Sequence, residues 1–280
     1  MINFRGIKAR PHDLEAMLQH GPSIVELHCS VRDFDWTPTR HYDVPLAVHL
    51  PEYDDGELLD PASEDENTRV RVEQIYSRAI GRAMAWERFF VGKPLIVFHP
   101  GGMGLEKKSA TSSLTALRGL CKTVAVLKHV AGGGVEILVV NLPASCWFFG
   151  GTWKASILTS GREMADFCLE NNIRCTLDLC HLYLACNELG MNPEAEILAC
   201  LPHVRHIHYS DGTGWDQEGL QIGMGDLPLE KCFEILSALP DMTYAVPEIW
   251  FGHENHGRGF IEAWRLLEAR FEANKAVMGS

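Results

Sequence analysis

Short apolar, β-branched runs alternate with longer amphipathic stretches along the chain, and this alternation limits the fold more than any other feature of the sequence. The runs lie at residues 24–28, 46–49, 95–99, 136–142, 174–179, 204–209 and 244–249, with a weaker one at 220–222. The amphipathic stretches lie at 64–90, 112–131, 156–171, 193–199, 228–239 and 259–273. Residues 30–44 contain Pro38 and are expected to form a loop. Strands that are apolar on both faces are buried on both sides, as in parallel sheets covered by helices.

Eight such strands with intervening helices predict an α/β fold, a (β/α)₈ TIM barrel. An open, doubly wound sheet is the alternative, but residues 26–33 (ELHCSVRD), which follow the first run, contain no glycine-rich turn. We find no linker, low-complexity tract or internal repeat. The 280 residues suit a single barrel domain over residues 1–280, with the barrel core at about 22–268.

Charge and cysteine content restrict the expected partners and compartment. With 25 basic and 37 acidic residues the formal charge is −12, which disfavours nucleic acid and anionic membranes as partners. Residues 1–17 lack the apolar segment of a signal peptide, and the nine cysteines include no CxxC pair. We therefore expect a cytoplasmic protein with reduced cysteines that acts on a small molecule. The sequence leaves open whether the protein forms a homo-oligomer.

Histidines and carboxylates gather at the C-terminal ends of the predicted strands, where TIM-barrel enzymes carry their active sites. These residues are Glu26, His28, His49, His99, Asp178, His181, His206, His208 and Glu248. Side chains at positions i and i+2 of a strand share a side, so His206 and His208 can both face the barrel mouth. A lone buried histidine is more often a hydrogen-bonded core residue than a ligand. A buried carboxylate, however, needs a cation or hydrogen-bond donors.

Imidazole and carboxylate groups are ligands that suit Zn²⁺, Mn²⁺, Fe²⁺ or Co²⁺. A catalytic metal needs about three protein ligands and an open position. Asp178, His208 and Glu248 would supply them, so the sequence predicts one divalent metal ion. The candidate catalytic residues are His99, His181 and His49. The candidates for additional metal or substrate contacts are Glu26, His28, His206 and Asn141.

An aromatic, glycine-hinged segment, CWFFGGTW at 146–153, follows the fourth run and is expected at the barrel mouth. Trp147 and Trp153 in this segment could stack on a flat or ring-shaped ligand. Trp250 and His253, which follow the last strand, are expected to contact substrate as well. The alternative for the aromatic segment is a hydrophobic lid over the helices or a subunit contact.

Taken together, these motifs resemble the xylose isomerase-like barrel superfamily, which includes endonuclease IV-type nucleases, sugar epimerases and inosose dehydratases. The resemblance rests on His49, FHPGG at 98–102, LDLCH at 177–181, HIHYSD at 206–211, IGMGDL at 222–227 and PEIW at 247–250. It implies that Asp178, His208 and Glu248 bind the shared divalent metal. It also implies that His49 and His99 bind further metals or substrate, and that the Asp-x-x-His motif ending at His181 contacts a metal or the substrate.

Two departures from the family pattern bear on the site. The family's fourth strand typically ends Glu-Asn-Leu-Pro, but here Val140 replaces the glutamate. The nucleases carry Asp-x-His before the IGxG turn, whereas Gln217-Glu218-Gly219 stands here, and Asp216 or Glu218 fits poorly as a replacement. The trinuclear nuclease site is therefore not expected. His99, His206, Glu26 or water would fill the vacancy at Val140, and we expect Val140→Glu to be tolerated and to tighten metal binding.

Val140 also favours one kind of chemistry, because sugar epimerases of this superfamily use two opposed carboxylates, whereas metal-activated water needs only one base. We therefore predict a metal-dependent amide or ester hydrolase of a small or medium-sized soluble substrate, similar to members that cleave corrinoid amides. The alternative is a sugar isomerase, epimerase or dehydratase. An abasic-site nuclease and a non-catalytic binding barrel are both disfavoured, and bound metal would distinguish the enzymes from the latter.

Overall fold

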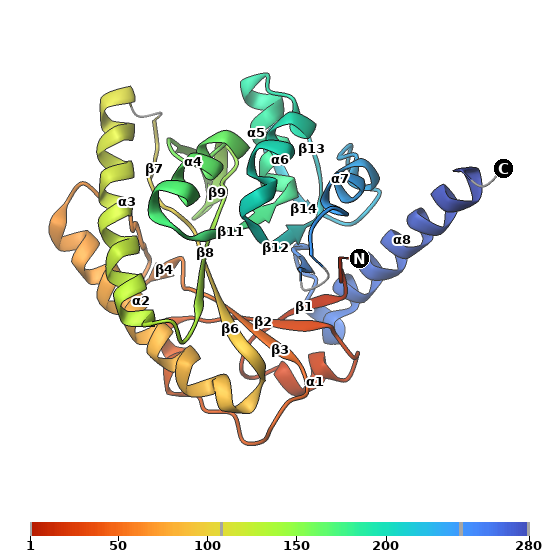
Figure 1. Ribbon diagram of the computed structural model, residues 1–280, viewed down its shortest axis with the longest axis horizontal. Helices are drawn as coiled ribbons and strands as arrows, with labels where there is room; N and C mark the ends of the chain where they lie inside the picture. The colour runs from red at the N-terminus through yellow and green to blue at the C-terminus, as the bar shows by residue number, and fades with distance from the viewer. Residues whose placement is uncertain (1, 107–108, 241–242, 279–280) are drawn as a thin grey trace.

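The computed structural model describes residues 2–106, 109–240 and 243–278, and it is built around an eight-stranded parallel barrel (Figure 1). The strands neighbour one another in chain order and close into the ring visible in Figure 1. They are β1 (Gly6–Ala9), β2 (Ile24–His28), β3 (Pro45–His49), β6 (Val91–Phe98), β8 (Glu136–Val140), β11 (Arg174–Asp178), β12 (Val204–Tyr209) and β15 (Tyr244–Pro247). The structure thus confirms the predicted (β/α)₈ barrel.

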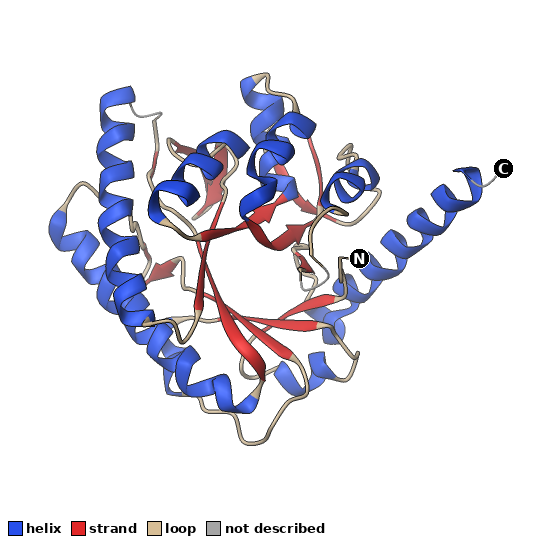
Figure 2. Ribbon diagram, in the orientation of Figure 1, coloured by secondary structure: helices blue, strands red, loops and turns tan. Residues whose placement is uncertain are grey.

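Helices surround the barrel (Figure 2). They are α1 (Leu14–Leu18), α2 (Glu66–Trp86), α3 (Ala110–Ala131), α4 (Gly161–Asn171), α5 (Leu179–Leu189), α6 (Pro193–Cys200), α7 (Leu229–Leu236) and α8 (Glu254–Met278), with short 3₁₀ turns at Val31–Asp35, Glu87–Phe89 and Leu201–His203. Near its start α8 has a kink at Asn255, His256 and Gly257, and it extends away from the barrel in Figure 1. No helix of the described residues is long and apolar enough to cross a membrane.

Short antiparallel ribbons form part of the loops that follow the barrel strands. They comprise β4 (Tyr53–Asp54) with β5 (Glu57–Leu58), β7 (Met103–Gly104) with β10 (Gly151–Ala155) and β9 (Ser145–Phe148), and β13 (Asp211–Thr213) with β14 (Gln217–Leu220). These ribbons carry several residues to the carboxyl end of the barrel that the barrel strands themselves do not supply.

The order of the strands differs from the prediction at two places. The predicted barrel began at residue 22, but β1 precedes it and pairs with β2 from Gly6↔Ile24 to Ala9↔Leu27. The predicted seventh strand at 220–222 is wrong, because β14 pairs only with β13 outside the barrel. The expected total of eight strands is correct because the missed first strand replaces the one that was placed wrongly.

The barrel closes between β1 and β15, where Gly6 allows the two strands to approach closely. A Cβ atom on Gly6 would lie 2.5 Å from Val246 Cγ2 and 2.6 Å from the carbonyl oxygen of Ala245. The neighbouring residue Asn3 continues the closure, since its carbonyl accepts a hydrogen bond from the Ala245 amide at 2.8 Å. Only glycine fits at this point of the ring.

We therefore expect Gly6→Ala to lower the free energy of unfolding by about 1–3 kcal/mol, because the added methyl group overpacks the closure. Gly81→Ala is the matched control, since Gly81 lies in α2 with no atom within 4 Å of the added Cβ. That substitution should stabilise the protein by up to about 1 kcal/mol. Urea unfolding measures both changes, and equal effects of the two substitutions would contradict this account of the closure.

Period-2 alternation sorts the strand side chains between two environments. Outward residues such as Val25 and Leu27 join the large core between the sheet and the helices. Inward residues near the strand starts form a second, smaller apolar cluster, which consists of Ile24, Ala47, Leu95, Val97, Leu138, Val140 and Val246. Along β2, the inward-facing side chains after Ile24 are those of Glu26 and His28. The inner face is thus apolar at one end and polar at the end where the strands finish.

Candidate metal centre

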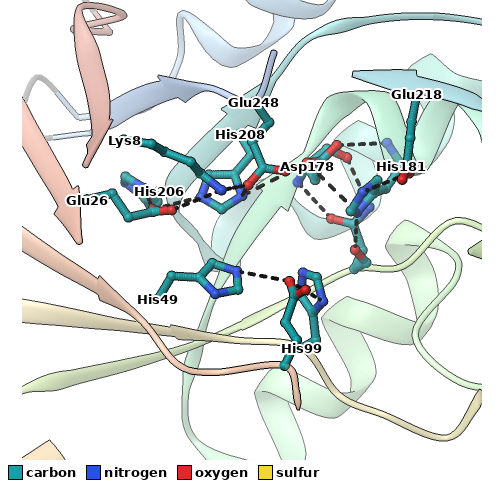
Figure 3. Close-up of polar contacts among 12 residues, drawn as sticks. Lys8, Glu26, His49, His99, Asp178, His181, His206, His208, Glu218 and Glu248 are labelled. Atoms are coloured by element: carbon teal, nitrogen blue, oxygen red, sulfur yellow. Dashed lines mark hydrogen bonds and ion pairs between the residues drawn. The ribbon is translucent and has the colours of Figure 1, made fainter. Parts of the chain in front are cut away.

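Asp178, His208 and Glu248 meet at the carboxyl end of the barrel, as the sequence predicts (Figure 3). They come from the ends of β11, β12 and β15, and their ligand atoms all lie within 4.8 Å of one another. His208 Nδ1 lies 3.1 Å from Glu248 Oε1 and 3.9 Å from Asp178 Oδ2. Two carboxylates from different strands therefore flank a single ring nitrogen.

Glu26 fixes the orientation of the His208 ring from the side opposite Asp178 and Glu248. Its Oε2 lies 2.8 Å from His208 Nε2 and 2.9 Å from His206 Nε2, and all three side chains are fully buried. A proton on His208 Nε2, donated to Glu26, leaves the lone pair on Nδ1 facing Asp178 and Glu248. Metal-binding histidines usually have their second nitrogen bonded to a carboxylate in this way. Glu26 and His206 thus support the site from beneath it.

The electrostatics keep the imidazole neutral and the buried carboxylate charged. Burial lowers the pKa of His208 to about 4 despite the opposing effect of Glu26. Burial alone would raise the pKa of Glu26, but the His208 imidazole and the Lys8 ammonium outweigh it and hold the pKa well below the usual value. A neutral imidazole and ionised carboxylates are the protonation states in which these groups ligate a metal.

The surroundings of His208 Nδ1 show whether a divalent cation fits this group of residues. The atom is buried and has no hydrogen-bond partner among the described residues, although both carboxylates are close. A buried nitrogen without a hydrogen-bond partner is costly unless a bound ion or water satisfies it. Two carboxylate oxygens and one imidazole nitrogen suit Zn²⁺, Mn²⁺, Fe²⁺ or Co²⁺, so the residues fit the predicted ion.

Lys8, which the sequence analysis did not single out, also reaches the group. It lies on β1 beside Glu26, and its ammonium contacts Glu248 Oε1 and lies 3.3 Å from Glu26 Oε1. The strand Gly-Ile-Lys-Ala lacks a continuous apolar run, so the apolar pattern of the sequence does not mark it as a barrel strand. The one feature of the sequence that could have pointed to Lys8 is its position two residues after Gly6, which places both on the same face of β1.

A second group lies beside the first and contains three of the predicted histidines. His28, His49 and Glu52 have ligand atoms within 4.8 Å of one another, and His99 Nδ1 lies 3.2 Å from Glu52 Oε1. Burial lowers the pKa of His28 to about 4 and those of His49 and His99 well below the usual value. Glu52, in the loop after β3, was not predicted, because no strand-end pattern marks it.

His181 stands in the first turn of α5 and forms a pair with Glu218. His181 Nε2 lies 3.3 Å from Glu218 Oε2, and the His181 amide donates to Asp178 Oδ1 at 2.7 Å. Burial alone would lower the pKa of His181, but Asp178 and Glu218 outweigh it and raise the pKa to about 9. Glu218 was expected to be a poor replacement for the Asp-x-His pair of the nucleases; β14 nevertheless carries it to the site, where it pairs with His181.

Asn141 and Val140 occupy supporting positions. The Asn141 amide donates to the Asp178 carbonyl at 2.9 Å and accepts from the Asp178 backbone N–H at 2.8 Å. Both ends of this amide are therefore engaged by the backbone of Asp178, and Asn141 lies outside the residues that line the cavity. Val140 is fully buried in the inner apolar cluster, so the end of β8 supplies no carboxylate.

A cavity of about 460 Å³ opens above the polar group. Its walls include Lys8, His99, Asp178, His181, Glu218 and Glu248, together with the aromatic residues Trp147, Phe148, Trp250 and Phe251. Of the four predicted substrate contacts, Trp147, Trp250 and His253 line it. Trp153 does not, because its indole N–H donates to the Phe148 carbonyl and its ring packs on a small cluster with Cys146. His49 and His206 are buried outside the lining.

Fold and site together define a TIM barrel with a polar cavity at the carboxyl ends of its strands, where enzymes of this fold carry their active sites. The chain belongs to the xylose isomerase-like TIM barrel family, whose model matches residues 38–270. The family assignment agrees with the resemblance carried by the sequence motifs.

Three individual proteins illustrate the similarity. An uncharacterised protein of Methanocaldococcus jannaschii is 27% identical over 208 residues, which are 72% of this chain and 62% of that protein. A D-tagatose 3-epimerase-like protein has a TM-score of 0.70 at 19% identity and covers 97% of this chain and 99% of its own. An IolI protein with bound zinc has a TM-score of 0.65 at 12% identity, with 94% and 95% covered. At these identities the two structures establish the fold alone.

Proposed function

We propose that the protein is a divalent-metal-dependent isomerase or epimerase that moves a proton at a carbon next to a carbonyl group of a small polyhydroxylated substrate. One observation carries this proposal. Four cavity-lining residues and one buried histidine form a row in which each residue contacts or lies close to the next (Figure 3). The order is His181, Asp178, the buried His208, Glu248 and Lys8. Proton-carrying groups thus stand at both ends of the metal group.

This arrangement answers the objection raised by Val140. Proton transfer on opposite faces of a substrate needs one acid or base on each side. Glu248 is the carrier on one side, and the pair of His181 and Glu218 is the carrier on the other. A divalent ion held by Asp178, His208 and Glu248 would polarise the substrate carbonyl and so acidify the neighbouring C–H. The similarity to an epimerase-like protein supports the same class of reaction.

The cavity agrees with a small substrate of mixed polarity. Its floor carries hydrogen-bonding groups that can position hydroxyls, whereas Trp147 and Trp250 can cover the apolar face of a carbon chain or ring. A volume of about 460 Å³ lies in the range of small-molecule sites.

We expect the metal-loaded protein to exchange a carbon-bound hydrogen of a ketose for deuterium in D₂O. Glu218→Gln should slow this exchange about 100-fold or more, because it removes the carboxylate that pairs with His181 Nε2. Glu188→Gln is the control, since Glu188 pairs with Lys154 and Ser145 at the same end of the barrel. NMR spectroscopy of a panel of ketoses measures both rates. Exchange that is equally fast in the two variants would remove Glu218 from the mechanism.

A hydrolase is the second candidate, and Val140 is the observation that favours it. Activation of water requires only one positioned base, and the Glu218 carboxylate, paired with His181, could provide it without a carboxylate on β8. The deuterium-exchange assay distinguishes the hydrolase from the isomerase or epimerase. A hydrolase would exchange no carbon-bound hydrogen in any ketose and would instead release product from amide or ester substrates.

A further inference from the structure

Lys8 links two carboxylates of the candidate metal centre. Its ammonium contacts Glu248 Oε1 and lies 3.3 Å from Glu26 Oε1, and its side chain is only 15% exposed. The register Lys8↔Glu26 between β1 and β2 places the lysine beside Glu26. Closure of β1 on β15 brings the same side chain to Glu248. The position of Lys8 is therefore set by the barrel itself.

Lys8 and a bound metal ion would need the same atom. Glu248 Oε1 is the oxygen that Lys8 contacts, and it is also the oxygen that lies 3.1 Å from His208 Nδ1. Two cations sharing one carboxylate oxygen repel each other, and the repulsion is stronger in a buried site than in water. The ammonium and a divalent ion therefore compete for Glu248.

Glu26 offers the ammonium a second position. Its Oε2 accepts from both imidazoles, whereas Oε1 has no hydrogen-bond partner among the described residues. Lys8 is already 3.3 Å from that free oxygen, so a small movement would convert the ion pair into a hydrogen bond. Release from Glu248 therefore does not leave the lysine without a partner.

We propose that Lys8 is a displaceable internal cation that sets the metal affinity of this site. It neutralises Glu248 before a divalent ion binds, and it moves onto Glu26 when the ion takes Glu248. Lys8 is thus a positioning residue that acts through Glu248. The inference rests on the proposed function, because it assumes that Asp178, His208 and Glu248 hold the ion.

Replacing Lys8 by an uncharged residue tests the competition directly. We expect both Lys8→Met and Lys8→Gln to tighten the binding of Zn²⁺ and Mn²⁺ to the purified metal-free protein by about tenfold or more, since the competing charge is gone. Isothermal titration calorimetry measures the affinity. Lys154→Met is the matched control, because Lys154 pairs with Glu188 at the same end of the barrel and should leave the affinity unchanged.

Thermal unfolding gives a second readout that does not depend on activity. Without metal, the Lys8 variants should melt at a lower temperature than the wild type, since Glu26 and Glu248 lose their cation. With metal, their melting temperatures should rise by more than that of the wild type. Lys8→Gln carries the test if Lys8→Met does not fold, because the amide can still donate to Glu248.

The outcomes separate this inference from the proposed function. If the wild type binds the ions and the Lys8 variants bind them no more tightly, the competition is overturned and the metal centre stands. If neither the wild type nor any Lys8 variant binds a divalent ion, the metal centre and the role of Lys8 both fall. Tighter binding in both Lys8 variants and unchanged binding in Lys154→Met support the inference.

Discussion

Asp178→Asn is expected to weaken divalent-metal binding by about 100-fold or more while the barrel stays folded. The substitution removes the negative charge and the better ligand oxygen from a group whose members lie within 4.8 Å of one another. Asparagine keeps the oxygen that accepts from the His181 amide and begins α5, so the helix retains its N-terminal cap. The effect should therefore fall on the ion and not on the fold.

Calorimetric titration and elemental analysis measure the loss, and circular dichroism checks the fold. Asp13→Asn is the matched control, because Asp13 lines the same cavity and accepts a hydrogen bond from the Arg10 amide but lies outside the three-residue group. It should retain the wild-type affinity. Full metal occupancy in Asp178→Asn would show that the ion is bound at another group, for instance His28, His49 and Glu52.

The three residues of the metal group could be predicted because they share one property: each stands at the carboxyl end of a barrel strand. A carboxylate such as Asp178 within an apolar strand is visible in the sequence, because burial without a cation or donors would be costly. The same rule located Glu248, and the i, i+2 pair of histidines at the end of an apolar strand located His208. It works because the carboxyl ends of parallel strands meet at one rim, whatever the path of the loops between them.

The parts that could not be predicted depend on loops or on an atypical strand. Glu52 and Glu218 reach the cavity on segments between barrel strands, whose course depends on tertiary packing. Lys8 stands on a four-residue strand whose inward positions are glycine and lysine, so no apolar run marks it. Trp153 shows the opposite error, since an aromatic residue at a barrel mouth can turn its ring into a small local core.

The missed residues change the chemical interpretation. From the sequence, the valine at position 140 removed one of two opposed acid–base groups and favoured hydrolysis. In the structure, Glu218 pairs with His181 on the side of Asp178, and Glu248 stands on the other side. Under the proposed function, this pair and Glu248 would be the two proton carriers. The strand-end pattern therefore located the site, but the loops supplied the groups that bear on the type of reaction.

Val140→Glu is expected to have two large and opposite effects, which the burial of Val140 makes predictable. The sequence led us to expect simple tolerance, but Val140 is fully buried among Leu95, Leu138 and other apolar residues of the inner cluster. A carboxylate there without a cation should lower the free energy of unfolding of the metal-free protein by about 3–5 kcal/mol. Tolerance is therefore expected only in the presence of a divalent ion.

With the ion present, the new carboxylate can turn toward Asp178, whose strand pairs with β8 through Thr176↔Val140. We expect it to tighten metal binding about tenfold or more, since an added anionic ligand attracts a divalent cation in a buried site. Thermal unfolding with and without Mn²⁺ or Zn²⁺ measures both effects at once. Val140→Gln is the control of equal size without charge, and it should lose stability without gaining metal affinity. A metal-induced rise in melting temperature no larger in Val140→Glu than in the wild type would mean that the end of β8 does not approach the ion.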